Sequence, residues 1–315
     1  MDIIVTLTLN PALDKTAVVE RLSPDRKLRS KDIRYEPGGG GINVSRAIRK
    51  LGGDSYAIYT RGGHTGAYFE HLLEKEGVKQ KPVAIDGITR ENFMAVESST
   101  ERHYRFGMPG PEIPTSKVEE CIDLIKNHDP APSFIVASGS LPSGLPDDIY
   151  GRVADAAAET GARFILDTSG EALKKGVKRG AFLLKPNLAE LSSLAGVDYV
   201  ELDMVEELAR RLVDEGKAEV VTVSLGAGGA LLAAGDFVEL IPSPTVRKKS
   251  VVGAGDSMVA AMVLCLAQGG SYREMIRRGV AAGAAATMMP GSELCRKEDA
   301  NQLYNWIVKN SPFKD

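Results

Sequence analysis

Short, wholly apolar runs alternate along this chain with segments of helical periodicity, and this alternation limits the fold more than any other feature of the sequence. The runs are Ile3–Val5, Phe134–Ala137, Phe164–Leu166 and, with one threonine, Val220–Val223. Strands that helices cover on both faces are apolar throughout in this way. In between, apolar residues at positions i, i+3, i+4 and i+7, as in residues 44–51, predict helices. The sequence therefore predicts an α/β fold, a doubly wound and mainly parallel sheet sandwiched by helices, with ligands at the carboxyl ends of the strands.

Two segments break this alternation, residues 13–36 and 88–108. Charged and apolar residues tend to alternate there with period two, and no helical stripe appears. This pattern is typical of strands with two different faces. Four antiparallel strands from these segments would form a small β lid. Because the chain has no linker, charge run or low-complexity segment, we expect residues 1–315 to form a single domain into which the lid is inserted.

The lid segments also predict how the protein assembles. Ile33 and Tyr35 share one face of the first segment, whereas Tyr104 and Phe106 share one face of the second and leave Arg105 on the other. A sheet this small is marginal unless its apolar face packs on something, and the predicted helices are all needed by the main sheet. We therefore expect a homodimer joined through the lids.

Composition and charge exclude several classes of partner. The 315 residues include 39 Lys and Arg against 42 Asp and Glu, which gives no electrostatic reason to expect nucleic acid or an anionic membrane. The longest apolar stretch, residues 258–267, is far shorter than the ~20 residues of a membrane span, and the N-terminus lacks the basic region of a signal peptide. Three distant cysteines, Cys121, Cys265 and Cys295, argue against a disulfide framework or a zinc site. We expect a cytoplasmic protein whose partner is a small molecule.

Glycine clusters mark the candidate sites. The Gly-x-Gly pairs lack the third glycine of a dinucleotide fingerprint, and the chain has no P-loop. What remains is Gly253-Ala254-Gly255-Asp256, just before an apolar helix expected to begin near Met258. Small residues there let backbone N–H groups converge on an anion at the positive end of the helix dipole, with Asp256 in the same turn. The alternative is that Asp256 only caps the helix.

A second cluster, Gly38-Gly39-Gly40-Gly41, precedes a helix expected to begin near Val44. Four glycines would let a ligand touch the backbone directly, while Asn43 offers both a donor and an acceptor. The alternative is a flexible turn with Asn43 as the helix N-cap.

Polar residues at strand ends and in the lid are further candidates. Lys185-Pro186-Asn187 follows an apolar run, and Glu190 lies three residues beyond Asn187. Their oxygen atoms could hold a hydrated Mg²⁺, although Asn-x-x-Glu is equally the pattern of a capping box. Ser138 lies at another strand end, where an ordinary turn is the alternative to a ligand contact. The lid's basic residues would either contact a ligand phosphate or lie in solvent; they are Lys27, Arg29, Arg90 and Arg105.

Together these motifs resemble the PfkB (ribokinase-like) carbohydrate kinase family over essentially the whole chain. Residues 39–43 are similar to the family's N-terminal signature and residues 253–256 to its C-terminal one. Further motifs, in the same order, most resemble the members that act on fructose 6-phosphate; they lie at residues 8–14, 104–110, 138–142 and 185–187. Relatives that act on fructose 1-phosphate or tagatose 6-phosphate usually carry Gly-Gly-Lys-Gly where this chain has an unbroken glycine run.

The resemblance implies that the chain transfers the γ-phosphoryl group of ATP to the C1 hydroxyl of fructose 6-phosphate. Asp256 would be the catalytic base, and the backbone N–H groups of Gly253, Ala254 and Gly255 would form an anion hole. The implied sugar contacts are Asp14, Gly39, Gly40, Asn43 and Ser138, with Lys27, Arg90 and Arg105 around the 6-phosphate.

The resemblance also implies the cofactor sites. The residues implied for ATP are Lys185, Asn187, Ser224, Gly226 and Gly229, and those implied for Mg²⁺ are Glu190 and Asn187. Members of the family usually have Asp-Thr where this chain has Ser250-Val251. A K⁺ site of backbone oxygens is a further expectation, around Ser250, Val252, Ala286 and Gly291.

Two other functions stay open at this point. Tagatose 6-phosphate kinase and 1-phosphofructokinase belong to the same family. A catalytically silent sensor of sugar phosphates or nucleotides could have kept the fold, but the intact Asp256, the glycines of the anion hole and Glu190 argue against it.

Overall fold

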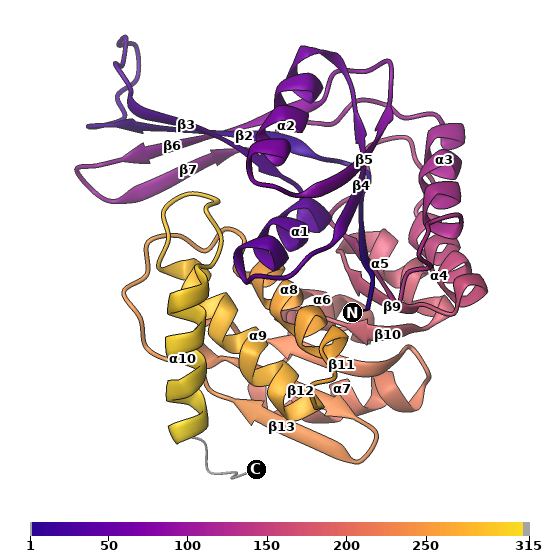
Figure 1. Cartoon of the computed structure of the whole chain (residues 1–315). Helices are drawn as coiled ribbons and strands as arrows, with labels where there is room; N and C mark the ends of the chain where they lie inside the picture. The colour runs from indigo at the N-terminus through magenta and orange to yellow at the C-terminus, as the bar shows by residue number, and fades with distance from the viewer. Residues whose placement is uncertain (1, 311–315) are drawn as a thin grey trace.

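The computed structural model describes residues 2–310 and confirms the predicted α/β sandwich (Figure 1). A nine-stranded sheet has the order β13-β12-β11-β10-β9-β8-β1-β4-β5. The pairings from β11 to β5 are parallel, and only β12 and β13 at one edge pair antiparallel. The strands are β1 (Ile4–Thr8), β4 (Tyr56–Arg61), β5 (Lys79–Ala84), β8 (Phe134–Ser138), β9 (Arg163–Asp167), β10 (Ala181–Leu184), β11 (Ala218–Ser224), β12 (Ala230–Ala234) and β13 (Phe237–Ile241).

Helices cover both faces of this sheet, as its wholly apolar strands require. One face packs against α3 (Thr115–Lys126), α4 (Ile149–Thr160), α5 (Gly170–Gly176), α6 (Leu188–Ala195) and α7 (Val205–Asp214). The other packs against α1 (Gly40–Lys50), α8 (Ala254–Ala267), α9 (Tyr272–Thr287) and α10 (Lys297–Asn310). The helix α2 (Gly63–Lys75) packs on Tyr59 of β4 through Phe69 and Leu73.

The predicted lid is a four-stranded sheet that projects from the main body (Figure 1). Its order is β3-β2-β6-β7, formed by β2 (Ala12–Val19), β3 (Lys31–Gly38), β6 (Arg90–Glu97) and β7 (Arg102–Phe106). The outer pairs are antiparallel, as expected, but the central pair β2–β6 is parallel. The reason is that the lid consists of two hairpins, β2–β3 and β6–β7, and that the first strand of one lies beside the first strand of the other. Residues 20–30 form a loop between β2 and β3 rather than strand.

The register of the lid confirms which residues share a face. Tyr35, Lys15, Phe93 and Phe106 are paired in line across the four strands, and Arg105 is paired with Met94 and so points to the opposite face. One expectation about the apolar face was wrong. The ring of Tyr68 in α2 packs edge-on against Tyr35, with ring centroids 5.7 Å apart, so a helix of the same chain covers part of this face.

Two helices begin earlier than the sequence pattern predicts, because glycines serve as their N-caps. The helix α1 begins at Gly40 rather than near Val44, after Gly39 with φ 113°. The helix α8 begins at Ala254 rather than near Met258, after Gly253 with φ 73°. Only glycine adopts such positive φ values without strain. Both candidate motifs therefore lie at true helix N-termini.

The structure also bears on two expectations about the chain's environment. All three cysteines are buried and none forms a disulfide. Among residues 2–310, no helix has both the length and the apolar character needed to cross a membrane.

Candidate active site

Asp256 lies in the first turn of α8, at the edge of the sheet where the parallel strands end. It makes no side-chain capping bond, so the simple capping alternative is wrong. Instead its Oδ2 accepts a hydrogen bond from Nδ2 of Asn43, at 2.9 Å. Asn43 is free to donate because Gly39, not Asn43, is the N-cap of α1. Two motifs more than 200 residues apart in the chain thus meet at one carboxylate.

The surroundings of Asp256 adjust its acidity. Burial raises the pKa of this carboxyl to about 7, and the negative charge of Asp167 acts in the same direction. The hydrogen bond from Asn43 and the charge of Lys185 oppose this shift. A carboxylate whose pKa lies near neutrality can both accept a proton from a substrate hydroxyl and release it again.

A buried ion pair lies beside this carboxylate. Lys185 is 5% exposed, and its Nζ lies 3.1 Å from Oδ1 of Asp167. Desolvation opposes the charge on Lys185, but Asp167, Glu190 and Asp256 outweigh it and raise the lysine pKa. A Cβ placed on Gly255 would lie 3.5 Å from Lys185 Nζ, so this ammonium lies against the first turn of α8.

Asp167 was missed from the sequence, although it is the last residue of β9 and directly follows an apolar run. Polar residues at the carboxyl end of a parallel strand are candidates on topology alone, and that signal could have found it. Ser138, which was predicted, is 1% exposed and donates to Asp167 Oδ2 at 3.3 Å. The structure places the Ser138 hydroxyl beside the Asp167 carboxylate. The contact of this hydroxyl with a sugar stays a prediction.

Asp14 and Arg90 lie together at the base of the lid. The carboxylate of Asp14 accepts a hydrogen bond from Asn92 at 2.8 Å, and burial raises its pKa although Asn92 and Arg46 act against the shift. Arg90 donates to the backbone carbonyls of Asn10 and Met108, both at 3.0 Å. Its buried Nε has no hydrogen-bond partner among the described residues, and neither has Oδ1 of Asn43. Both atoms are enclosed in this arrangement, so neither is open to a ligand as the side chains lie here.

The glycine run has a packing role that the sequence did not indicate. A Cβ on Gly40 would collide with Oγ of Ser138, and one on Gly38 would collide with the carboxylate of Asp14. The missing side chains thus bring α1, β8 and β2 into direct contact. Gly39 and Gly40 stay partly exposed, as the expected ligand contact requires.

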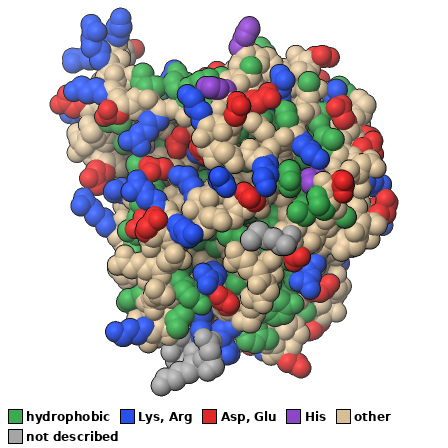
Figure 2. Space-filling model, in the orientation of Figure 1, with side chains coloured by type: hydrophobic (Ala, Val, Ile, Leu, Met, Phe, Trp, Pro, Cys, Tyr) green, Lys and Arg blue, Asp and Glu red, His purple; other side chains and the backbone are tan. Residues whose placement is uncertain are grey.

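The other basic residues of the lid are divided between two places. Arg105 is on the lid face that carries Asp14. Lys27 and Arg29 are exposed in the loop between β2 and β3, at the far end of the lid where basic side chains gather (Figure 2). The structure does not bring Lys27 to the Asp256 site of its own chain.

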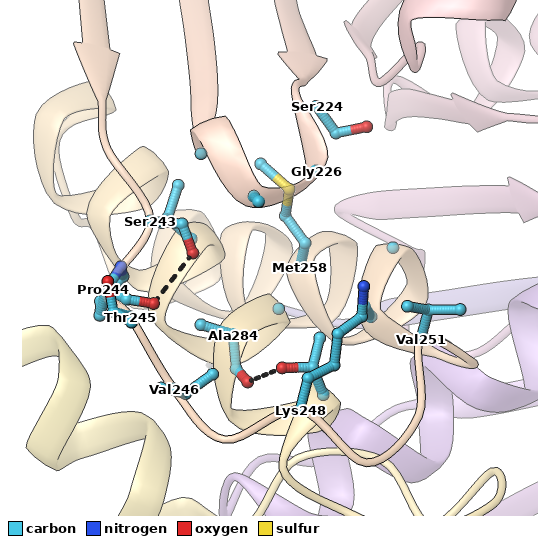
Figure 3. Close-up of a pocket in the computed structure, with 17 residues that line it drawn as sticks. Ser224, Gly226, Ser243, Pro244, Thr245, Val246, Lys248, Val251, Met258 and Ala284 are labelled. Atoms are coloured by element: carbon cyan, nitrogen blue, oxygen red, sulfur yellow. Dashed lines mark hydrogen bonds between the residues drawn. The ribbon is translucent and has the colours of Figure 1, made fainter. Parts of the chain in front are cut away.

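A pocket of about 410 Å³ opens on the other side of the first turn of α8 (Figure 3). Three of the five residues predicted for the nucleotide, Ser224, Gly226 and Gly229, line it together with Ala254 and Gly255. The other two, Lys185 and Asn187, do not. Residues 243–248 and α9 supply walls that the sequence did not indicate, and their lining residues are Ser243, Pro244, Thr245, Val246, Lys248, Val280, Gly283, Ala284 and Thr287. With Val251 and Met258 these walls are mainly apolar, which suits a flat heterocyclic base.

Asn187 and Glu190 form the capping box that was the alternative to a metal site. Asn187 Oδ1 accepts from the Glu190 amide at 2.9 Å, and Glu190 Oε2 accepts from the Asn187 amide at 2.8 Å. This leaves Oε1 of Glu190 without a capping role. Burial raises the pKa of Glu190, and Asp167 adds to the shift. Among residues 2–310 no three His, Cys, Asp or Glu side chains are placed to hold a metal by themselves. Mg²⁺ is usually held by one or two carboxylates together with substrate phosphates and water, and this donor set fits that mode.

Over most of its length the chain is similar to known proteins. Residues 8–299 match the model of the pfkB family carbohydrate kinases. The ATP-dependent 6-phosphofructokinase isozyme 2 of Mycobacterium tuberculosis is 42% identical over 301 residues, covering 96% of this chain and 88% of that protein. Phosphofructokinase-2 from Escherichia coli is similar in its complex with potassium (TM-score 0.93, 40% identity, 98% of this chain and 99% of that one). It is also similar in its complex with fructose-6-phosphate (TM-score 0.91, 39% identity, 98% and 99%). From its sequence, its fold and this site, the chain belongs to the pfkB family of carbohydrate kinases.

Proposed function

We propose that the protein is an ATP-dependent 6-phosphofructokinase, which transfers the γ-phosphoryl group of ATP to the C1 hydroxyl of fructose 6-phosphate. One observation carries this proposal. Asp256, a carboxylate with a pKa near 7, lies at a helix N-terminus between the polar base of the lid and the apolar pocket. The relatives named as 6-phosphofructokinases at about 40% identity support the choice of sugar.

In this mechanism the C1 oxygen attacks the γ-phosphorus, and its proton passes to Asp256. The bond from the γ-phosphorus to the oxygen that bridges it to the β-phosphate breaks, and ADP leaves with that oxygen. The backbone N–H groups of Gly253, Ala254 and Gly255 stabilise the charge on the transferring group, because first-turn amides have no acceptor within the helix. Asn43 holds the Asp256 carboxylate in place through its hydrogen bond.

The lid supplies the sugar site. Asp14, Gly39 and Asn43 bind hydroxyl groups, and Arg90 and Arg105 bind the 6-phosphate. The place of Arg90 beside Asp14 and the hydrogen bond from Asn43 to Asp256 support these roles. Lys27 lies too far along the lid of its own chain for this site, so its contact with the phosphate requires the lid of a partner subunit.

The pocket and the residues beyond it take ATP. The adenine of ATP lies in the pocket, between residues 224–229 and α9. Lys185 contacts the phosphates of ATP. Glu190 and Asn187 would hold Mg²⁺, which would neutralise charge on the phosphates. Backbone oxygens of Ser250, Val252, Ala286 and Gly291 would hold a K⁺ ion. The amides of Lys249 and Ser250 bond the carbonyl of Thr287, which brings these two segments together and supports the K⁺ site.

The function is tested by comparing substrates side by side. We expect ADP release, measured as kcat/KM, to be highest with fructose 6-phosphate among fructose 6-phosphate, tagatose 6-phosphate and fructose 1-phosphate. A preference for either of the other two sugars makes the protein another kinase of the family. No ADP release with any of them, despite ATP binding, favours the silent sensor.

The pKa of Asp256 predicts the pH dependence of the reaction. A general base works only when it is deprotonated, so kcat/KM should fall as the pH drops through about 7. Asp167→Asn removes a charge that raises the Asp256 pKa and should move this acidic limb to lower pH. Profiles of kcat/KM between about pH 5 and pH 9 measure this. Asp147→Asn, at an exposed carboxylate, is the control and should leave the acidic limb of the profile at the same pH. An acidic limb that Asp167→Asn does not shift counts against Asp256 as the base.

We also propose that two chains pair through the apolar face of their lids. Ile33 and Phe106 are 51% and 49% exposed there, and Tyr68 covers only the edge near Tyr35. Pairing the lids would bury both copies of this face at once and would bring Lys27 towards the partner's sugar site.

Light scattering at micromolar concentration tests the assembly. The wild type should be a dimer, and the double variant Tyr104→Asp with Phe106→Asp should be a monomer, because carboxylates on that face would lose their hydration in the interface. Leu240→Asp is a matched control, since Leu240 is 52% exposed but lies on the edge strand β13. A dimer that survives the double variant rules out this interface.

A further inference from the structure

The carboxylate of Glu36 joins three parts of the molecule that the proposed mechanism treats separately. In the lid, Glu36 of β3 lies opposite Asp14 of β2 in the antiparallel pairing of these two strands. Its Oε2 accepts a hydrogen bond from Oγ of Ser292 at 3.0 Å. Its Oε1 lies 3.9 Å from the guanidinium of Arg46 in α1. Ser292 is only 2% exposed, so this bond is shielded from water.

The segment that carries Ser292 continues directly to the anion hole. Leu294 is fully buried and packs so closely on Gly253 that a Cβ there would collide with its side chain. The backbone amide of Cys295 donates to Oγ of Ser257, the residue after Asp256, at 3.4 Å. Residues 291–295 therefore contact the lid at one end and the first turn of α8 at the other.

Arg46 makes the lid end of this connection rigid. It is 1% exposed and forms a two-pronged ion pair with Glu76, at 2.7 and 2.6 Å. It also donates to the carbonyl of Pro37 at 2.6 Å, directly before the glycine run. Through these contacts Arg46 holds the end of β3 against α1. Arg34 adds a second link, with its NH1 3.7 Å from Glu293 Oε2.

We propose that Glu36 and Ser292 are positioning residues that couple the sugar site to the anion hole, so that a sugar phosphate bound under the lid strengthens the binding of ATP. The inference rests on the proposed function for the identity of the two ligands. Coupling between sites is reciprocal, so bound ATP strengthens sugar binding by the same factor. Neither residue touches a reacting atom in this scheme.

The test measures the coupling factor directly. Isothermal titration calorimetry gives the Kd of a non-hydrolysable ATP analogue without and with saturating fructose 6-phosphate, and the ratio of the two Kd values is the factor. For the wild type we expect about 5 to 150. Ser292→Ala should lower it by about tenfold, or to 1 where the wild-type factor is smaller, because a hydrogen bond to a carboxylate is lost. Glu36→Gln, which keeps an acceptor oxygen but not the charge, should lower the factor less.

A matched control separates coupling from a general loosening of the lid. Thr65 in α2 donates to Glu91 in β6 at 3.2 Å, which is also a hydroxyl–carboxylate bond between core and lid but lies away from residues 291–295. Thr65→Ala should keep the wild-type factor. The proposal is overturned by a wild-type factor of 1, by an unchanged factor in Ser292→Ala and Glu36→Gln, or by an equal loss in Thr65→Ala. A wild type that does not bind fructose 6-phosphate contradicts the proposed function and this inference together, whereas binding without coupling overturns the inference alone.

Discussion

Asp256→Asn is expected to lower kcat by about 10²- to 10⁴-fold while ATP still binds. Asparagine keeps the size of the side chain and can still contact Asn43, but it cannot accept the proton of the C1 hydroxyl. Steady-state kinetics measure kcat, and titration with an ATP analogue measures binding. A variant that keeps more than about a tenth of the wild-type kcat contradicts the role of Asp256 as base, since even the low end of the range is larger.

The same variant should not be less stable than the wild type, which separates a catalytic role from a structural one. The Asp256 pKa is raised in the folded chain, to about 7. A carboxyl whose folded pKa lies above its unfolded pKa contributes stability at low pH and loses that contribution as the pH rises through the folded value. Above pH 7 the wild type therefore carries an unfavourable, partly buried charge that Asp256→Asn lacks. Thermal unfolding at about pH 8 should give the variant an equal or higher Tm.

Lys185→Met is expected to lower the free energy of unfolding by about 3–5 kcal/mol, the usual effect of removing one partner of a buried ion pair. Lys185 is the buried ammonium among Asp167, Glu190 and Asp256, so its loss leaves their charges uncompensated. Denaturant unfolding measures the change. Adding Asp167→Asn should recover a large part of the loss, because it removes the carboxylate nearest to the missing charge.

A surface pair provides the control for this prediction. Lys175 and Asp147 also lie 3.1 Å apart, but both side chains are more than 40% exposed. Exposed pairs contribute about 0–1 kcal/mol, so Lys175→Met should change the unfolding free energy little. A similar effect of both substitutions means that burial does not set the strength of the Lys185 pair.

The sequence predicted those parts of the fold and site that a local pattern specifies. Apolar runs and helical periodicity gave the sandwich, and period-two alternation gave the lid and its two faces. Small residues before an apolar helix indicated Asp256, and the structure shows it at the N-terminus of α8. In each case the signal lies within a few neighbouring residues.

What depends on contacts between distant segments could not be predicted in the same way. Alternation indicates a strand but not the direction of its partner, so the parallel pairing of β2 with β6 was missed. Asp167 follows an apolar run, a signal that was overlooked, but its pairing with Lys185 follows only from the adjacency of β9 and β10. Residues 243–248 have neither periodicity nor glycine, and only the folded chain brings them to the pocket. For Asn187 and Glu190 the capping box is confirmed, and the Mg²⁺ role stays a prediction.

In the proposed reaction, the Asp256 site transfers the γ-phosphoryl group of ATP to C1 of fructose 6-phosphate. Phosphorus NMR of the reaction mixture, with the sugar, ATP and Mg²⁺ present, tests it most directly because it identifies the phosphorylated carbon. We expect equal amounts of ADP and fructose 1,6-bisphosphate with the wild type, and almost none of either with Asp256→Asn over the same time. Inorganic phosphate without a bisphosphate, a phosphate on another carbon, or an undiminished yield with Asp256→Asn would contradict it.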